Sequence, residues 1–148
     1  MSDITFEQIL QEQGQLVYTN VGDSMMPLLR QGRDLMVIQQ RPQGRCKRLD
    51  AVLYKRPNGK YVMHRILKVR KDDYVICGDN RCVREFGVPD EWIIGVLTGV
   101  IRDGKKQISV QHWNYRLYVH LWCDFFWVRV FLIRVGRTLA KIKRKIMK

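Results

Sequence analysis

The stretch DAVLYKRPNGKYVMHRILKV, residues 50–69, decides the fold class. Its two halves, 50–56 and 60–69, are rich in aliphatic and aromatic residues that favour a pleated, half-buried strand. Between them stands PNG at 57–59, three residue types that are typical of tight turns because each supports a special backbone conformation. This order predicts a β-hairpin.

Similar β-rich runs surround the hairpin. Separated by turn-forming segments such as QGR and RPQGR, they occur at 15–21, 34–40, 73–78, 91–101 and 107–111. Short strands with no long helical pattern between them are typical of a β-sandwich or barrel. Residues 3–13 read as a short helix, with Asp3 as its N-cap and Gly14 as its stop. We therefore expect a mainly β, compact domain with a short N-terminal helix.

Length and composition fit a folded domain with an unusual charge. The chain has 148 residues, 46% hydrophobic and 28% charged, which excludes a disordered tail, a collagen-like repeat and a polytopic membrane protein. The formal charge of +13 predicts an anionic partner. Residues 113–148 hold nine Lys and Arg against one Asp, a net of +8, whereas residues 1–112 have a net of +5. We therefore expect a β domain at 1–112 and a basic, aromatic tail at 113–148.

From residue 113 onward the hydrophobic period becomes helical. Apolar residues recur at steps of three and four and make one stripe: Val128, Phe131, Leu132, Val135, Leu139, Ile142 and Ile146. Basic residues fall on the opposite side: Arg134, Arg137, Lys141, Arg144, Lys145 and Lys148. The pattern predicts a C-terminal amphipathic helix.

The tail is too polar to favour crossing a bilayer. Residues 117–135 contain four ionisable side chains that oppose insertion into a bilayer: His120, Asp124, Arg129 and Arg134. A central charge costs roughly 2.5–3.5 kcal/mol, whereas an apolar residue returns only about 0.3–0.6 kcal/mol. An interfacial helix fits better, because each Lys or Arg gains about 1 kcal/mol near an anionic leaflet. We expect 113–148 to lie on an anionic membrane surface; packing of 113–132 on the β domain is the alternative.

The N-terminus and the cysteines indicate the compartment. The segment MSDITFEQILQEQG has acidic residues, no long apolar run and no cleavage site, so it does not read as a targeting segment. The four cysteines, Cys46, Cys77, Cys82 and Cys123, show neither a CxxC pair nor ligand spacing with histidine. We expect reduced thiols, no metal, no cofactor and a peripheral location at a membrane, at its cytoplasmic face with the outer face as the alternative.

Two residues with catalytic potential stand out. Ser24, in GDSMMPLL at 22–29, follows a β run and is followed three residues later by Pro27, so its hydroxyl is held on a turn where it can act as a nucleophile. His64 lies inside a strand pattern, and neutral imidazole is the base that a serine nucleophile needs near neutral pH. Taken singly, Ser24 is more simply explained as an ordinary turn serine, and His64 as a half-buried histidine of a strand.

A carboxylate follows the strand that ends in CGDN, residues 77–80. Asp79 projects into the turn, where it can orient a histidine base and stabilise its protonated form, the third role of a catalytic triad. An Asp-Asn turn that caps its own backbone is the alternative.

In this order and spacing the three stretches resemble the signal peptidase I-like serine peptidases, the superfamily that also holds self-cleaving SOS-type repressors. The resemblance runs from about Val17 to Val100 and rests on a Gly-x-Ser-Met-x-Pro box, a downstream Gly-x-Asp run, a His-Arg-Ile box and Gly-Asp-Asn followed by Ile-Ile-Gly. It implies a signal-peptidase-like β domain with Ser24 as the nucleophile. His64 matches the histidine of the Ser-His branch rather than the lysine of the bacterial housekeeping branch.

The resemblance also implies the acid and the reaction. Asp79 is retained, but Arg84-Glu85 stands where the Ser-His branch has a paired Asp-Asp, so Glu85 is a second candidate. Ser24 would attack a peptide carbonyl while His64 takes its proton, and water would hydrolyse the acyl-enzyme. We therefore expect a membrane-associated serine endopeptidase that acts on signal or leader peptides of preproteins.

Other functions remain as alternatives. A catalytically degenerate peptide- or nucleic-acid-binding module attached to a membrane surface is the main one, because the tail has the aromatics and cations of single-strand binding. Its helical stripe nevertheless makes nucleic acid the less expected partner. A self-cleaving repressor is not expected, since 23 residues before Ser24 cannot hold a helix-turn-helix.

Overall fold

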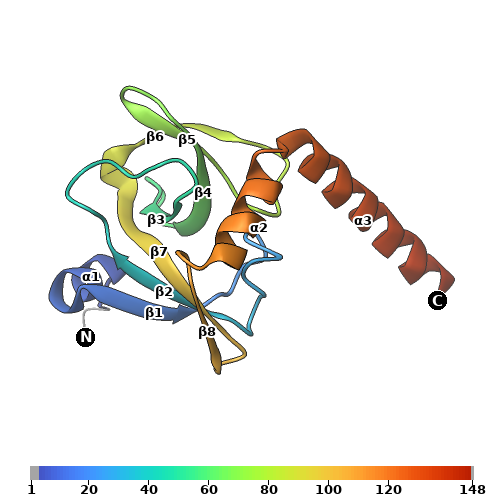
Figure 1. Cartoon of the computed structure of the whole chain (residues 1–148), viewed down its shortest axis with the longest axis horizontal. Helices are drawn as coiled ribbons and strands as arrows, with labels where there is room; N and C mark the ends of the chain where they lie inside the picture. The colour runs from blue at the N-terminus through green and yellow to red at the C-terminus, as the bar shows by residue number, and fades with distance from the viewer. Residues whose placement is uncertain (1–3, 148) are drawn as a thin grey trace.

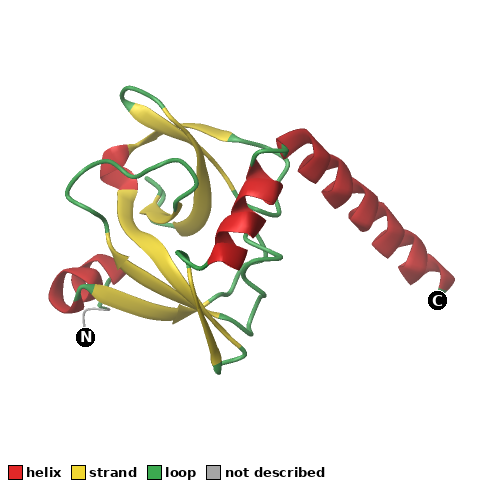
Figure 2. Cartoon of the chain, viewed as in Figure 1, coloured by secondary structure: helices red, strands yellow, loops and turns green. Residues whose placement is uncertain are grey.

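The structure, a computed structural model, describes residues 4–147, which form an antiparallel sheet with three α-helices (Figures 1 and 2). The elements follow in the order α1 (Phe6–Gln13), β1 (Gln15–Thr19), β2 (Leu35–Gln40), β3 (Ala51–Lys55), β4 (Tyr61–Val69), β5 (Asp73–Cys77), β6 (Glu85–Pro89), a 3-10 turn (Asp90–Trp92), β7 (Ile93–Arg102), β8 (Lys106–Ser109), α2 (Trp113–Cys123) and α3 (Phe126–Ile146). The prediction of a mainly β domain with an N-terminal and a C-terminal helix is confirmed. The four cysteines are free thiols.

All strands of the described chain belong to one sheet. Their order is β1-β2-β7-β3-β4-β5-β6, and β8 pairs with β7. The long strand β7 pairs with β2, β3 and β8, so it joins the two halves of the sheet. The register shifts at Val37/Ile38 in β2 and at Leu53/Tyr54 in β3. Such irregularities bend a strand and increase its twist, and the sheet curls around its core (Figure 2).

The hairpin predicted from the DAVLYKRPNGKYVMHRILKV stretch is formed by β3 and β4. The two strands pair in register, with Val52 opposite His64. The Arg56 N–H donates to the Lys60 carbonyl at 2.9 Å and closes the turn. Gly59 takes a φ of 81°, a conformation that side chains disfavour. The hairpin presents the middle of β4 to the candidate site.

Two elements differ from the sequence-based expectation. Strand β6 was not predicted, because EFGVP contains a glycine and a proline; it is an edge strand in which Gly87 takes a φ of 72°. Helix α1 begins at Phe6, and its N-cap is Thr5, whose side chain accepts from the Gln8 N–H in a capping box. Asp3, the predicted cap, lies outside the described residues.

The tail consists of two helices with different surroundings. Helix α2 packs on the sheet and adds three side chains to the main hydrophobic core: Tyr115, Val119 and Cys123. Helix α3 follows a break at Asp124 and Phe125; its last buried residue is Ile133, and its C-terminal part extends away from the β domain (Figure 1). Among the helices of residues 4–147, none has the length and hydropathy that crossing a membrane requires.

Candidate active site

Ser24 lies half-buried in the loop between β1 and β2, on a series of turns. The buried side chain of Asn20 clamps this loop, since its Nδ2 donates to the carbonyls of Gly22 and Leu29 at 2.8 and 3.1 Å. Directly after the serine, Met25 is buried in the core. A polar clamp on one side and an apolar anchor on the other therefore fix the turn that carries Ser24.

His64 lies in β4, and only 12% of its side chain is exposed. Its Nδ1 is 3.3 Å from the Tyr54 hydroxyl and 3.7 Å from Oε1 of Glu85. Tyr54 donates to that same Oε1 at 2.7 Å, and Arg56 donates to both carboxylate oxygens, from Nη2 at 2.8 Å and from Nε at 3.1 Å. Because the Tyr54 proton goes to Glu85, the Tyr54 oxygen can accept from Nδ1–H, which leaves Nε2 unprotonated.

Burial controls the protonation of the imidazole. It lowers the pKa of His64 to about 4; the attraction of Glu85 only partly opposes it, and Arg56 and Arg81 add repulsion. Burial also raises the pKa of Glu85, but hydrogen bonds from Arg56 and Tyr54 outweigh it, so that pKa lies below its ordinary value. At neutral pH the site therefore holds a neutral imidazole beside an ionised carboxylate.

Ser24 and His64 come together at Gly78, in the loop after β5. A Cβ atom at Gly78 would lie 2.6 Å from the Ser24 carbonyl oxygen and 3.0 Å from Nε2 of His64, so only glycine fits without displacement. The Asn80 N–H donates to the same Ser24 carbonyl at 2.7 Å and joins the two loops. Within the described chain the Ser24 hydroxyl and the imidazole do not form a hydrogen bond.

The carboxylate of Asp79 forms an ion pair with Arg65 and does not contact the imidazole of His64. Nε and Nη2 of Arg65 donate to its two oxygens at 2.9 and 2.8 Å, and both side chains are fully buried. From α2, the Tyr118 hydroxyl donates to Oδ2 at 3.0 Å, and Trp122 Nε1 donates to the Asp79 carbonyl at 2.7 Å. Of the two acids proposed from the sequence, Glu85 is the one whose carboxylate lies beside Nδ1, whereas Asp79 ties the loop after β5 to α2.

A cleft of about 640 Å³ exposes both candidate catalytic residues, Ser24 and His64. Its apolar lining includes the buried side chains Met36, Leu53 and Met63. Among the described residues that line it, the charged ones are all basic: Arg56, Lys60 and Arg81. The volume is in the range of natural ligand sites. The cleft therefore offers an apolar pocket with a cationic rim beside a serine and a histidine.

The residues that support this arrangement were not predicted from the sequence. Tyr54 and Arg56 hold Glu85 from strand β3, and Arg65 neutralises the buried aspartate. Only Arg65 carries a local signal: it shares one side of β4 with Met63, and a charge at a buried position needs a partner. The contacts of Glu85 depend on β6, the strand that was not predicted.

Comparison of the chain with protein-family models, curated proteins and solved structures finds no match. The geometry of the cleft and the order of the sequence boxes are therefore the observations that bear on function.

Proposed function

We propose that this protein is a serine endopeptidase with a signal-peptidase-like fold, and that it removes signal or leader peptides. Ser24 is the nucleophile and His64 the general base. The observation that carries the proposal is that a serine held on a turn and a neutral, buried histidine line the same cleft. A serine is a weak nucleophile and needs an adjacent base in its neutral form. The four sequence boxes in order support the same assignment.

The hydrogen bonds around the imidazole support a direction of proton transfer. Nδ1–H of His64 is directed to Tyr54 and Glu85, so Nε2 is the nitrogen that accepts the Ser24 proton. The ionised Glu85, held by Arg56, stabilises the imidazolium that forms. The Ser24–His64 hydrogen bond forms when substrate binds, since such contacts are often long in unliganded enzymes.

The remaining steps use the same groups. His64 returns its proton to the leaving amine, and water then hydrolyses the acyl-enzyme on Ser24. The Ser24 N–H contributes to the oxyanion hole, where one donor is typically worth about 100- to 1,000-fold in turnover. Asp79 acts at a distance, by holding the loop that contacts the serine turn.

The lining of the cleft favours a particular substrate. A peptide bound in an extended conformation places one side chain in the apolar pocket beside Met36 and Met63. Two cations of the rim are paired with carboxylates, Arg56 with Glu85 and Arg81 with Asp23. The charge of Lys60 is therefore the one that favours an acidic side chain elsewhere in the peptide. Lys60 is exposed at this rim, so Lys60→Glu should lower kcat/KM for an acidic peptide and raise it for a basic one.

The direct experiment is cleavage of a leader- or signal-peptide panel, chosen with acidic and basic flanks, by wild type and variants. Ser24→Ala and His64→Ala should each lower turnover by at least about 1,000-fold. Ser109→Ala and His112→Ala are matched controls away from the cleft and should retain activity. Undiminished cleavage by both site variants would end the proposal. Saturable peptide binding by a wild type that cleaves nothing would support the degenerate binding module instead.

A further inference from the structure

Helix α3 carries an apolar face that the β domain leaves uncovered. Its exposed large hydrophobic side chains are Trp127, Val128, Phe131, Leu132, Val135, Leu139, Ile142 and Ile146. A helix with about 3.6 residues per turn places all of these except Trp127 on one side. An uncovered apolar face of this extent marks a surface that binds another molecule.

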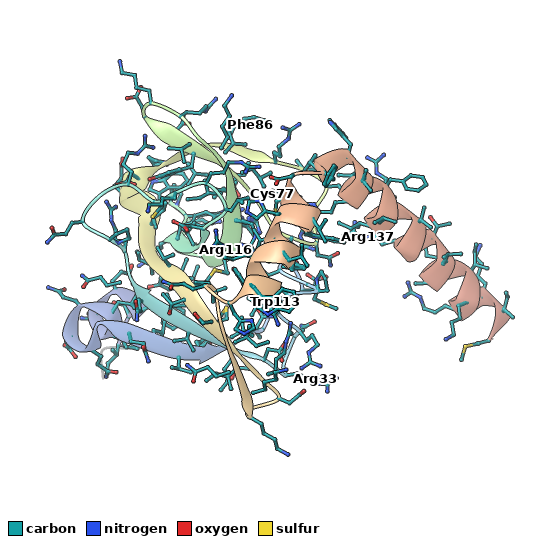
Figure 3. The ribbon with its side chains drawn as sticks, viewed as in Figure 1. Arg33, Cys77, Phe86, Trp113, Arg116 and Arg137 are labelled. Atoms are coloured by element: carbon teal, nitrogen blue, oxygen red, sulfur yellow. The ribbon has the colours of Figure 1, made fainter. Side chains whose placement is uncertain are left out.

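This face points away from the β domain. The opposite side of α3 holds three buried residues: Arg129, Val130 and Ile133. Arg129 donates to the Arg81 carbonyl at 3.2 Å, and about two turns later Arg137 donates to the Asn80 carbonyl at 3.0 Å. Figure 3 shows Arg137 on the side of α3 that is turned towards α2. The loop after β5 therefore sets the rotation of α3 and leaves its apolar face outward.

The charge of α3 is of one sign. Between residues 125 and 147 there are seven Lys and Arg and no Asp or Glu. By helical position, Lys143 borders the apolar face on one side and Lys145 lies on its other flank, whereas Lys141 lies farther round towards the opposite side. From the two flanking positions long side chains reach the level of the apolar face and keep their charged ends in water or among anions.

We propose that α3 binds the surface of an anionic lipid bilayer, with its apolar face at the acyl boundary and its cations among the headgroups. If α3 packed against α3 of a second copy of this chain, seven cations of one helix would face seven of the other with no acidic residue between them, which opposes a dimer. Single-stranded nucleic acid would neutralise the cations and leave the apolar face in water. A bilayer of anionic lipid satisfies both features, and this binding does not depend on the peptidase chemistry.

The test is co-sedimentation of the full chain with vesicles of phosphatidylcholine alone or mixed with phosphatidylglycerol. The chain should bind the anionic vesicles and bind the neutral ones at least about tenfold more weakly. The double variant Leu139→Ser/Ile142→Ser should weaken binding by about tenfold or more per residue. Both residues are exposed, so the fold stays intact. Ile4→Ser is the matched control and should bind like wild type: Ile4 is an exposed apolar residue two positions before α1, and α1 lies at the end of the molecule opposite α3 (Figure 1).

A second variant tests the charges. Replacing Lys141, Lys143 and Lys145 by Gln should weaken binding by about fivefold per charge. Equal binding to neutral and anionic vesicles, or no effect of either variant, would overturn the proposal. The proposal would also be overturned if sedimentation velocity showed a dimer that the Leu139→Ser/Ile142→Ser variant dissociates. Binding of poly(U) RNA that this variant leaves unchanged would overturn it as well. Ser24→Ala should bind vesicles like wild type, and the Leu139→Ser/Ile142→Ser variant should still cleave a soluble peptide. These two results separate the membrane proposal from the peptidase assignment.

Discussion

The buried, neutral state of His64 makes a quantitative prediction about stability in acid. In the unfolded chain a histidine has a pKa of about 6.5, and in the folded protein the pKa of His64 is lowered to about 4. Between these two values the unfolded state binds a proton that the folded state does not, so acidification favours unfolding. The free energy of unfolding should fall by up to about 1.4 kcal/mol per pH unit, and by about 2.5 kcal/mol in total between pH 7.5 and pH 4.5.

The assay is urea unfolding, followed by tryptophan fluorescence, across this pH range for wild type and His64→Gln. The variant removes the titrating imidazole and leaves the other ionisable groups, so the difference between the two pH profiles isolates His64. Glu85 contributes little in this window. Its pKa is below the ordinary value, so the stability it adds is lost only as the pH falls below about 4.5.

Parallel profiles for the two proteins would refute the reasoning, because they would show that the imidazole titrates alike in both states. The same pKa sets the activity of the proposed peptidase. Since kcat/KM follows the base of the free enzyme, its acid limb should lie near pH 4. A limb near pH 6.5 would contradict the burial argument as well.

Three further substitutions follow from contacts around the site. Asp79→Asn should lower the free energy of unfolding by roughly 3–5 kcal/mol in urea titrations, because it leaves the buried Arg65 guanidinium without its counter-charge; a loss under 1 kcal/mol would contradict the ion-pair argument. Gly78→Ala should lower peptide cleavage at least tenfold and the free energy of unfolding by about 1–3 kcal/mol, because its methyl group would collide with the turn that carries Ser24. Gly22→Ala is the control: its methyl group has open space, so it should destabilise the fold less. A larger loss of stability for Gly22→Ala would argue against the close approach at Gly78. Arg129→Met should leave the melting temperature unchanged or raise it, because within the described chain Nε and Nη1 of this buried side chain have no hydrogen-bond partner.

The fold was predictable where the signal is local. The β3–β4 hairpin follows from two β-rich runs and a PNG turn, and α3 follows from apolar residues at steps of three and four. Strand β6 could not be predicted, because its Gly87 and Pro89 are turn formers in isolation and are tolerated only at a sheet edge.

The candidate site divides in the same way. Ser24 and His64 were proposed as catalytic from the order of the sequence boxes and the resemblance that they carry, and in the structure both line one cleft. The sequence could not show whether Asp79 or Glu85 lies beside His64, because this depends on contacts between residues far apart in the sequence. Arg65 forms its ion pair with Asp79 because β4 pairs with β5, and Tyr54 of β3 donates a hydrogen bond to Glu85 of β6. Such contacts exist only after the sheet has closed.

The position of α2 has a consequence for anyone who shortens or transplants this protein. Composition suggests cutting after residue 112, but the hydroxyls of Tyr115 and Tyr118 serve the buried Arg65–Asp79 pair, and a chain cut there would expose that pair to water. A fusion that ends after Arg134 keeps α2 and the packed turns of α3, and it removes the outer half of the apolar face of α3: Val135, Leu139, Ile142 and Ile146. The smallest portable unit is therefore the sheet together with α2 and the packed first turns of α3, and only the outer length of α3 can be exchanged between host chains.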